Sequence, residues 1–330
     1  MVKPGGAVKH AAVFCDKPVI KKRGYLLEVT ARRPKETTLR RLVERLALLR
    51  YNELFLYDAG AGGSAGETIV RYAAMKGVEI LEIGEEELRE LRREGVIEVA
   101  TEAARSLAGR VEAMRERMAL ASVARIGDLR PLGEGASRVA RHTMGDRRPQ
   151  VEAKVERFLV TDFSDGRDWH SPIISLPGIV MGGYFAMIGA KAAKMDLERE
   201  VAQFLDAPLA GTLLKLGTLY LRGGAYREDS SEYFNILAGD RGYSRHPGIT
   251  DFVLEEVSSV LRGVMKEAER HLNRGESAQE ILYTALLLDA SCHRKSEVRL
   301  KTVKEEFVKM WNRHYEPAGR DAAASKLPRF

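Results

Sequence analysis

The chain has 330 residues, of which 45% are hydrophobic and 30% charged, and its net charge is +6. This composition is typical of a soluble globular protein with one large domain or two medium ones. No apolar run approaches the roughly 20 residues that cross a bilayer, and the amino-terminal segment lacks the apolar centre of a secretory signal. The two distant cysteines, Cys15 and Cys292, indicate separate thiols rather than a disulfide framework. We therefore expect a cytoplasmic protein with no membrane partner.

The positive net charge raises the question of a nucleic-acid partner. Basic and acidic residues are interleaved, as in the segment EEELRELRR at residues 85–93, and this pattern is typical of solvated helix faces. We therefore expect no nucleic-acid partner. The chain also has only four asparagines and three glutamines, and this scarcity of labile amides together with dense charge indicates a thermophilic protein.

The first part of the chain alternates between strand and helix patterns. After a lead-in over residues 1–22, short apolar runs predict strands at 25–30, 53–57 and 78–83. A helix capped by Thr37 or Thr38 separates the first two strands, and its apolar residues recur at helical spacing as far as Leu49. A glycine-rich loop at 59–66 leads to a second helix that ends before Gly77, and a short charged helix follows at 85–93.

Further along, the pattern becomes less regular. We predict a long helix at 99–120, a strand at 122–126, a Pro/Gly loop at 129–135, and loop or weak helix at 136–156. A clear strand follows at 158–161. From Pro177 onward the sequence is almost wholly helical, with predicted breaks near Gly211, Gly223–Gly224 and His246–Pro247.

Two segments of the chain carry a family resemblance. One has Arg23-Gly24-Tyr25 at a strand start, a threonine-led helix, and LRYNELFLY at residues 49–57. The other is FLVTDFSD at residues 158–165, followed by His170 and Pro177-Gly178. The first resembles the opening βα unit of glycoside hydrolase family 20, the β-N-acetylhexosaminidases and their relatives. The second resembles the last barrel strand of a subgroup of that family, and the helices after Pro177 resemble the carboxyl-terminal extension of that subgroup.

The resemblance implies a (β/α)8 TIM-type barrel, but the chain is too short for a complete one. About five strand–helix units precede residue 165, whereas the barrel alone usually needs about 250 residues. We therefore expect an incomplete or derivative α/β barrel at residues 23–176 and a helical region at residues 177–330. Because an open parallel sheet exposes its edge strands, we also expect a homo-oligomer.

The resemblance implies a substrate-assisted retaining mechanism, in which an adjacent Asp-Glu pair supplies the general acid and orients the substrate's acetamido group. This sequence has Asp128 after a predicted strand and Glu134 in the glycine-flanked loop that follows. These two acids are the candidate catalytic residues. Since general acid catalysis contributes roughly 10² to 10⁴ in rate, the incomplete pair leaves two hypotheses open. The protein is either a hydrolase of β-linked N-acetylhexosamine glycosides or an inactive carbohydrate-binding relative.

The resemblance also implies sugar-binding residues around the pocket. The guanidinium of Arg23 is expected to contact sugar hydroxyls, and the acids at the end of the last strand are expected to do the same. The full set of candidate substrate-binding residues is Arg23, Asp58, Asp162, Phe163, Asp165, Trp169 and His170. A structural role stays open for each of them, such as a turn-capping aspartate, a buried ion pair or a core tryptophan.

A different class of function remains open as well. The segment GAGGSA at residues 60–65 fits the pattern G-x-G-x-x-A between a strand and a helix, and Glu82 ends the next strand about 20 residues later. That context is typical of dinucleotide binding, although a flexible loop has the same composition. No spacing of His, Cys or Asp predicts a metal site, and the glycoside hydrolase hypothesis requires no cofactor.

Overall fold

The computed structural model describes the chain over several ranges. They are residues 18–59, 65–93, 96–100, 157–162, 169, 171–217, 219, 226–227, 230–231, 250–293, 297–325 and 327. Among these residues, no helix combines the length and the apolar character needed to cross a membrane.

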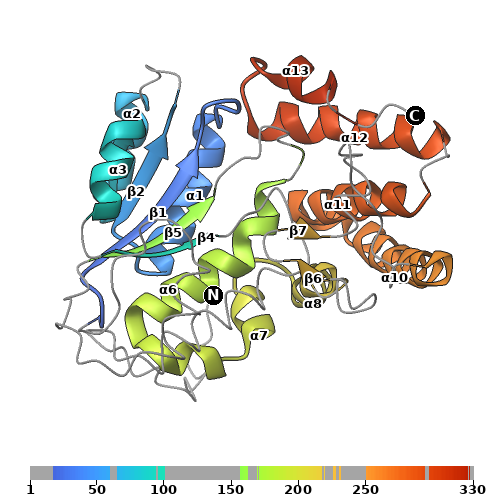
Figure 1. The fold of residues 1–330 in the computed structure, drawn as a ribbon, viewed down its shortest axis with the longest axis horizontal. Helices are drawn as coiled ribbons and strands as arrows, with labels where there is room; N and C mark the ends of the chain where they lie inside the picture. Colours follow the sequence, from blue (N-terminus) through green and yellow to red (C-terminus); the bar gives the residue numbers. More distant parts are fainter. Residues whose placement is uncertain are drawn as a thin grey trace, which may run out of the picture.

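A parallel sheet forms the first layer of the fold (Figure 1). Its strands are β1 (Lys22–Glu28), β2 (Glu53–Tyr57), β3 (Glu79–Ile83), β4 (Val96–Ala100) and β5 (Arg157–Asp162), in the order β3-β2-β1-β5-β4. All four pairings are parallel, and β2 and β5 are buried at every position. Short apolar runs buried on both faces are what a covered parallel sheet requires.

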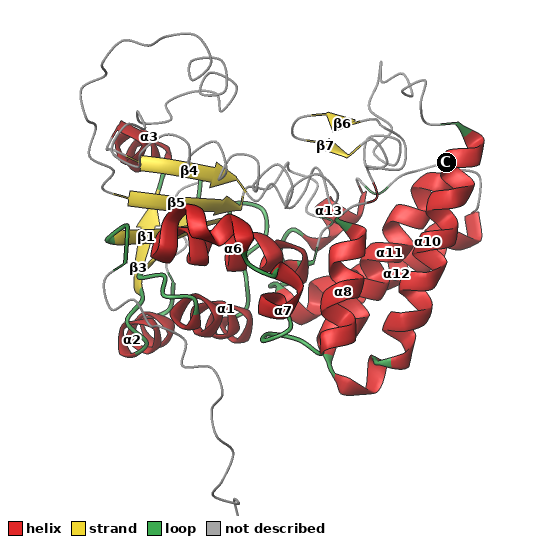
Figure 2. Ribbon diagram, turned by 90° about the horizontal axis from the view of Figure 1, so that it is seen from below, coloured by secondary structure: helices red, strands yellow, loops and turns green. Residues whose placement is uncertain are grey.

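Helices cover both faces of this sheet (Figure 2). Helices α1 (Glu36–Leu48) and α2 (Glu67–Met75) lie on one face, where Leu39, Val43 and Leu46 of α1 are buried. Helix α3 (Glu85–Arg93) lies on the opposite face, and its residues Leu88 and Leu91 belong to a cluster with side chains of β1, β2 and β5. The helical spacing of the apolar residues of α1 therefore predicts correctly which side of that helix is buried.

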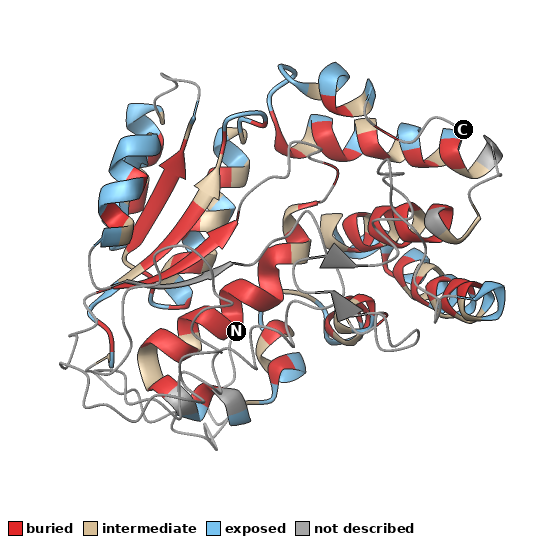
Figure 3. Cartoon of the chain, in the orientation of Figure 1, coloured by how far each residue is buried: buried red, intermediate tan, exposed pale blue. Residues whose placement is uncertain are grey.

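The chain after β5 is helical. The α-helices are α6 (Leu176–Ile188), α7 (Leu197–Val201), α8 (Ala207–Leu216), α10 (Asp251–Arg270), α11 (Glu276–Cys292), α12 (Glu297–His314) and α13 (Arg320–Ser325). Short 3-10 turns are η2 (Pro172–Ser175), η3 (Gly189–Lys194) and η5 (Leu272–Arg274), and β6 (Tyr226–Arg227) pairs antiparallel with β7 (Ser230–Ser231). Helix α6 is buried along most of its length between the sheet and the other helices (Figure 3).

Three predictions about local structure are wrong. The cap expected at Thr37 or Thr38 is one of them, because α1 begins at Glu36 and Lys35 is its N-cap residue. The helix expected from residue 99 cannot begin there, because Val96–Ala100 forms β4, whose β-branched residues pair in parallel with β5. The break expected near Gly211 is absent, because α8 runs through that residue. A Cβ atom at Gly211 would meet only the carboxylate of the exposed Glu198, at 2.7 Å from its Oε1 atom, and this flexible side chain can move away.

The predicted α/β class and helical carboxyl-terminal region are confirmed. A closed barrel is not shown, because the described strands form one linear order with β3 and β4 at its ends. The strand expected at 122–126 and the breaks expected at Gly223–Gly224 and His246–Pro247 lie outside the described residues.

Candidate functional site

The edge of the sheet where β1 and β5 end is the natural place for a ligand. From β1 the chain proceeds to β2 on one side, whereas β5, which arrives much later in the sequence, pairs with β1 on the other side. In open α/β sheets, ligands bind outside the carboxyl ends of the strands at such a point of reversed strand order. The strand order therefore predicts a ligand site beyond Glu28 and Asp162.

A cavity of about 380 Å³ lies in this position. Its walls come from the ends of β1 and β5, one side of α1, the η2–α6 segment, the start of α11 and the end of α12. Its polar lining residues are Tyr25, Arg32, Thr38, Arg41, Arg45, Asp162, Glu276, Ser277, Glu280, His314 and Tyr315. The cavity thus joins the α/β sheet to the last helices of the chain.

Asp162 is the most firmly held acid of the cavity. Its Oδ2 atom accepts hydrogen bonds from Tyr25 Oη and Ser175 Oγ, both at 2.7 Å, and Arg32 Nη2 lies 3.6 Å from its Oδ1 atom. Burial, followed by the charge of Asp162 and the hydrogen bond to it, raises the pKa of Tyr25 well above its usual value. Tyr25 is therefore a neutral donor, and Asp162 is a carboxylate with a fixed orientation.

Arg32 and Tyr315 are buried residues of the cavity wall. Arg32 is only 1% exposed, although it is a surface-type residue, and its Nη1 atom lies 3.4 Å from the Tyr315 hydroxyl. The guanidinium carbon is also 5.6 Å from the centre of the Tyr315 ring. A buried guanidinium needs such partners, and here an aspartate and an aromatic ring supply them.

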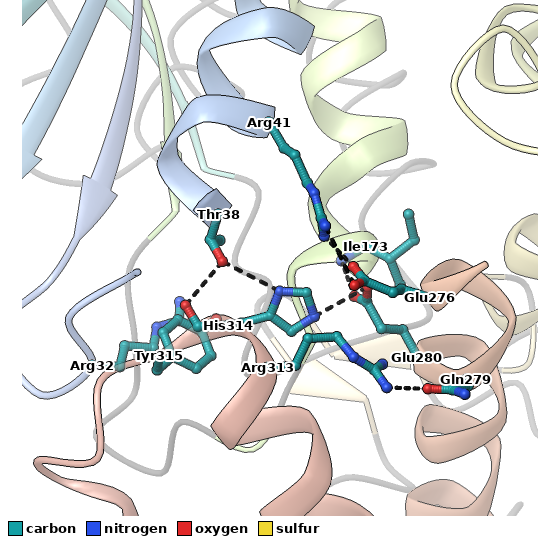
Figure 4. A network of polar contacts seen from close by, with 10 residues as sticks. All are labelled: Arg32, Thr38, Arg41, Ile173, Glu276, Gln279, Glu280, Arg313, His314 and Tyr315. Carbon is teal, nitrogen blue, oxygen red and sulfur yellow. Dashed lines mark hydrogen bonds and ion pairs between the residues drawn. The ribbon is translucent and has the colours of Figure 1, made fainter. Parts of the chain in front are cut away.

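Glu280 and His314 form a second buried pair, contributed by α11 and the end of α12 (Figure 4). Glu280 Oε2 accepts the backbone N–H of Ile173 at 3.1 Å, and its Oε1 lies 3.2 Å from His314 Nε2. Burial alone would raise the pKa of Glu280, but the hydrogen bond and charge of His314 and the Ile173 N–H outweigh burial and lower it. Glu280 is therefore ionised at neutral pH.

The other side of His314 is held by α1. Thr38 Oγ1 donates to the backbone carbonyl of His314 at 3.0 Å and lies 3.5 Å from His314 Nδ1. Nearer to solvent, Arg41 of α1 forms a two-pronged ion pair with Glu276 at the start of α11. Figure 4 shows these contacts linking α1 to α11 and α12 around one space. The cavity is therefore bounded by polar contacts between distant parts of the chain.

Of the expected sugar-binding residues that the structure describes, which are Arg23, Asp58, Asp162 and Trp169, only Asp162 lines this cavity. Arg23 pairs with Phe158 at the start of β5, four residues before Asp162, which corresponds to about 13 Å along a strand. Its guanidinium donates to the backbone carbonyls of Ile20, Lys21 and Arg50 at the amino edge of the sheet. Arg23 and Asp162 therefore do not line a common cavity.

Two further candidates have contacts outside the cavity. Asp58 carries an ion pair with Arg33 at 3.6 Å. Trp169 is 2% exposed, donates from Nε1 to the carbonyl of Ala323 at 3.2 Å, and packs in a cluster with aromatic residues of α12. These contacts resemble the structural roles that the sequence left open.

The remaining candidates lie outside the described residues. They are the catalytic candidates Asp128 and Glu134 and the substrate-binding candidates Phe163, Asp165 and His170. The glycines of the proposed dinucleotide motif, at residues 60–63, also lie outside them. The carboxylate of Glu82 accepts a hydrogen bond from the backbone N–H of Ala65, just before α2. The acid that the dinucleotide hypothesis assigns to the ribose therefore holds the backbone of Ala65. Within the described ranges, no group of His, Cys, Asp and Glu side chains has the arrangement of a metal site.

Sequence reasoning missed the site residues supplied by the last helices. Glu280 did carry a signal, because it recurs at helical spacing with the buried residues Tyr283, Thr284 and Leu287 and is the one charged member of that face. A charge on the buried face of a helix requires a partner. The packing of α12 decides that His314 is the partner of Glu280, and the sequence pattern does not predict this packing.

Comparisons with known proteins add no assignment. No family model matches the chain, and no curated protein gives a significant match.

Proposed function

We propose that the chain binds a single β-linked N-acetylhexosamine unit in the cavity between the sheet edge and the last helices. The observation that supports this proposal is the oriented carboxylate of Asp162, held by Tyr25, Ser175 and Arg32 at the carboxyl end of β5. An ionised carboxylate accepts hydrogen bonds only, so it is a natural partner for sugar hydroxyls. Asp162 is also one of the acids for which the resemblance implies a sugar-binding role.

The rest of the cavity suits the same kind of ligand. Small-molecule sites usually measure about 300 to 1,000 Å³, so a cavity of about 380 Å³ has room for one sugar unit rather than a long oligosaccharide. Sugar hydroxyls both donate and accept hydrogen bonds, and this wall contains carboxylates, guanidiniums and hydroxyls.

We further propose that the sheet is a shortened relative of a (β/α)8 barrel. Support comes from the pairing of β1 with β5, because a barrel closes when its last strand pairs with its first. The described part also departs from a barrel. Side chains of α3 pack against Leu26, Phe55 and Leu159, so a helix covers the sheet face that would line a barrel's interior. This covering helix explains how fewer strands can still bury both faces.

Hydrolysis is the second part of the proposal. A substrate-assisted retaining reaction needs a proton donor at the leaving oxygen and a group that orients the acetamido oxygen, and we assign these roles to Glu134 and Asp128. An aryl N-acetyl-β-glucosaminide tests this step directly. Release of the aryl group that is lost in Asp128→Asn and in Glu134→Gln supports hydrolysis, whereas binding without release identifies a carbohydrate-binding protein.

Ligand binding is tested by calorimetry and thermal unfolding with N-acetylglucosamine and, separately, NAD. We expect the sugar to raise the melting temperature of the wild-type protein. We also expect Asp162→Asn to weaken sugar binding at least tenfold, because a hydrogen bond to a charged group contributes about 1.5 to 3 kcal/mol. Stabilisation by NAD and none by the sugar would reject the proposal in favour of a dinucleotide site.

A matched control is available at the opposite edge of the sheet. Glu53 is also a buried acid paired with an arginine, since its carboxylate lies 2.9 Å from Nε of Arg157. Glu53→Gln should lower stability, as Asp162→Asn does, but leave sugar affinity unchanged. Equal loss of affinity in both variants would show that general destabilisation, rather than a lost ligand contact, explains the result.

A further inference from the structure

One arginine of the cavity lining, Arg45, takes no part in the ion pairs around the cavity. Each of the three carboxylates that line it has a basic partner: Asp162 has Arg32, Glu276 has Arg41, and Glu280 has His314. These three pairs account for every acid that the described part of the cavity wall contains. The remaining basic residue of the lining is Arg45, in the last turn of α1.

Among the residues that the structure describes, the Arg45 guanidinium has no hydrogen bond and no ion pair. It is nevertheless only partly exposed, in contrast to Arg41 at the solvent side of the same helix. Burial lowers the pKa of Arg45, the charge of Glu280 acts in the opposite direction, and Arg41 lowers the pKa further. A partly buried guanidinium with five donors and no acceptor has an unmet need for a negative group.

We propose that Arg45 binds an oxyanion substituent of the ligand, such as a phosphate, sulfate or carboxylate group. This inference rests on the proposed function, because it places a charged substituent on the sugar unit assigned to the same cavity. The planar guanidinium matches the oxygen pairs of these groups, and Arg41 adds a second positive charge beside it. Thr38 and Ser277 in the same lining offer neutral hydroxyl donors.

The proposal gives a role to the arginine at this position of α1. The residues before and after it on the buried side, Val43 and Leu46, pack in the core, so Arg45 lies where the helix meets the cavity. The three carboxylates of the wall pair with other basic residues, so an oxyanion of the ligand would supply the negative charge that Arg45 lacks. The preferred ligand is therefore an acidic sugar rather than a neutral one.

The test compares the binding of four probes by calorimetry at low and high salt. The probes are N-acetylglucosamine, its 6-phosphate, its 6-sulfate, and inorganic phosphate. We expect the wild-type protein to bind at least one of the charged sugars tenfold or more tightly than the neutral sugar at low salt, and to lose part of this preference at high salt. Comparison of the phosphate and sulfate arms identifies the oxyanion.

Arg45→Gln should remove this preference, so that charged and neutral sugars bind with similar affinity, while Arg45→Lys should restore part of it. Arg40→Gln is the matched control, because Arg40 lies on the same helix but pairs with Glu36 and packs over Tyr72, away from the cavity. It should leave every affinity unchanged. Thermal unfolding of each variant confirms that it is folded.

The outcomes separate this inference from the proposed function. Sugar binding with no preference for the charged forms, or an equal effect of Arg45→Gln on charged and neutral sugars, overturns the role of Arg45 and leaves the sugar site standing. If no sugar binds but inorganic phosphate does, and Arg45→Gln abolishes it, the sugar assignment fails and the oxyanion site stands. If no probe binds, both are rejected.

Discussion

At the scale of single residues, the cavity is built from buried polar groups that hold one another in place. Asp162 is fixed by a phenol, a hydroxyl and a guanidinium, and Glu280 by a backbone N–H and an imidazole. Such networks contribute little net stability when complete, because desolvation offsets the attraction. Removing one member is costly, because the remaining polar group then stays buried without its partner.

Two buried tyrosines provide a comparison of this effect. Tyr25 Oη donates to the carboxylate of Asp162 at 2.7 Å, whereas Tyr51 Oη donates to the neutral carbonyl of Ile179 at 2.8 Å. Tyr25→Phe should lower the free energy of unfolding by about 1.5 to 3 kcal/mol, and Tyr51→Phe by about 0.5 to 1.5 kcal/mol. Urea unfolding measures both. A larger loss in Tyr51→Phe would contradict the charged state assigned to Asp162.

The buried acid Glu280 predicts a specific pH dependence. Its pKa in the folded protein lies below the ordinary value of 4.5, because His314 and the Ile173 N–H outweigh the effect of burial. An acid with a lowered folded pKa adds stability above its unfolded pKa and loses it as the pH falls through the folded value. Glu280→Gln should therefore be less stable than wild type at pH 7, by roughly 1 to 3 kcal/mol, and this difference should shrink below pH 4.5.

Urea unfolding at a series of pH values checks this expectation. Glu67→Gln is the control, because Glu67 is 78% exposed and forms an ion pair with the exposed Arg71. Exposed ion pairs of this kind contribute little. A difference between wild type and Glu280→Gln that stays constant from pH 7 to pH 3 would show that Glu280 is not an ionised partner of His314.

At the scale of elements, α6 is the piece that joins the sheet to the helical region. Its sequence LPGIVMGGYFAMI is apolar on every side, as expected of a helix that contacts protein all round. Two adjacent glycines, Gly182 and Gly183, let its backbone approach Leu49, Tyr51 and Val160 closely. The helix therefore depends on the absence of side chains at these two positions.

A pair of glycine substitutions tests this packing. A Cβ atom at Gly182 would lie 2.6 Å from Oη of Tyr51, so Gly182→Ala should destabilise the protein by about 1 to 3 kcal/mol through overpacking. Gly263 in α10 has nothing within 4 Å of the equivalent position, so Gly263→Ala should stabilise by about 0.4 to 1 kcal/mol. Thermal unfolding gives both shifts. If both substitutions destabilise the protein, the loss of stability in Gly182→Ala cannot be attributed to contact with Tyr51.

At the scale of the whole molecule, the cavity lies where the two main parts of the chain meet. One buried cluster includes β1, β2, α1 and α6 together with residues of α8, α10 and α11, so the sheet and the helical region share a core. The site residues follow the same division, with Arg32 and Asp162 from the first part and Glu280 and His314 from the second. Ligand binding and the docking of the last helices should therefore be coupled.

The ends of the sheet predict self-association. In the described part of the chain, β3 and β4 end the strand order, and an exposed strand edge tends to pair with another chain. Charge from Glu79 and Glu82 opposes such pairing at the β3 edge, so we expect the contact between copies at the β4 edge. We expect a dimer in light scattering at micromolar concentration. A monomer over the whole concentration range would remove this expectation.

The local part of the fold could be predicted from the sequence. Apolar runs at residues 53–57 and 158–161 predict β2 and β5, and the leucine spacing of 39–49 predicts the buried face of α1. The start of the expected helix at residue 99 is wrong, because pairing with β5 outweighs the local helical pattern of the segment. Propensity and periodicity are local quantities, so they predict elements better than partners.

The sequence by itself determined the α/β class, the helical carboxyl-terminal region, and Asp162 as an acid at a strand end. Only the tertiary structure decided that Arg23 points to the opposite edge of the sheet and that Arg32, Arg45, Glu280 and His314 line the cavity beside Asp162. The physical reason is that strand and helix patterns depend on neighbouring residues, whereas this cavity depends on contacts between distant parts of the chain, such as Tyr25–Asp162, Thr38–His314 and Arg41–Glu276. Those contacts are set by packing and charge pairing across the whole chain.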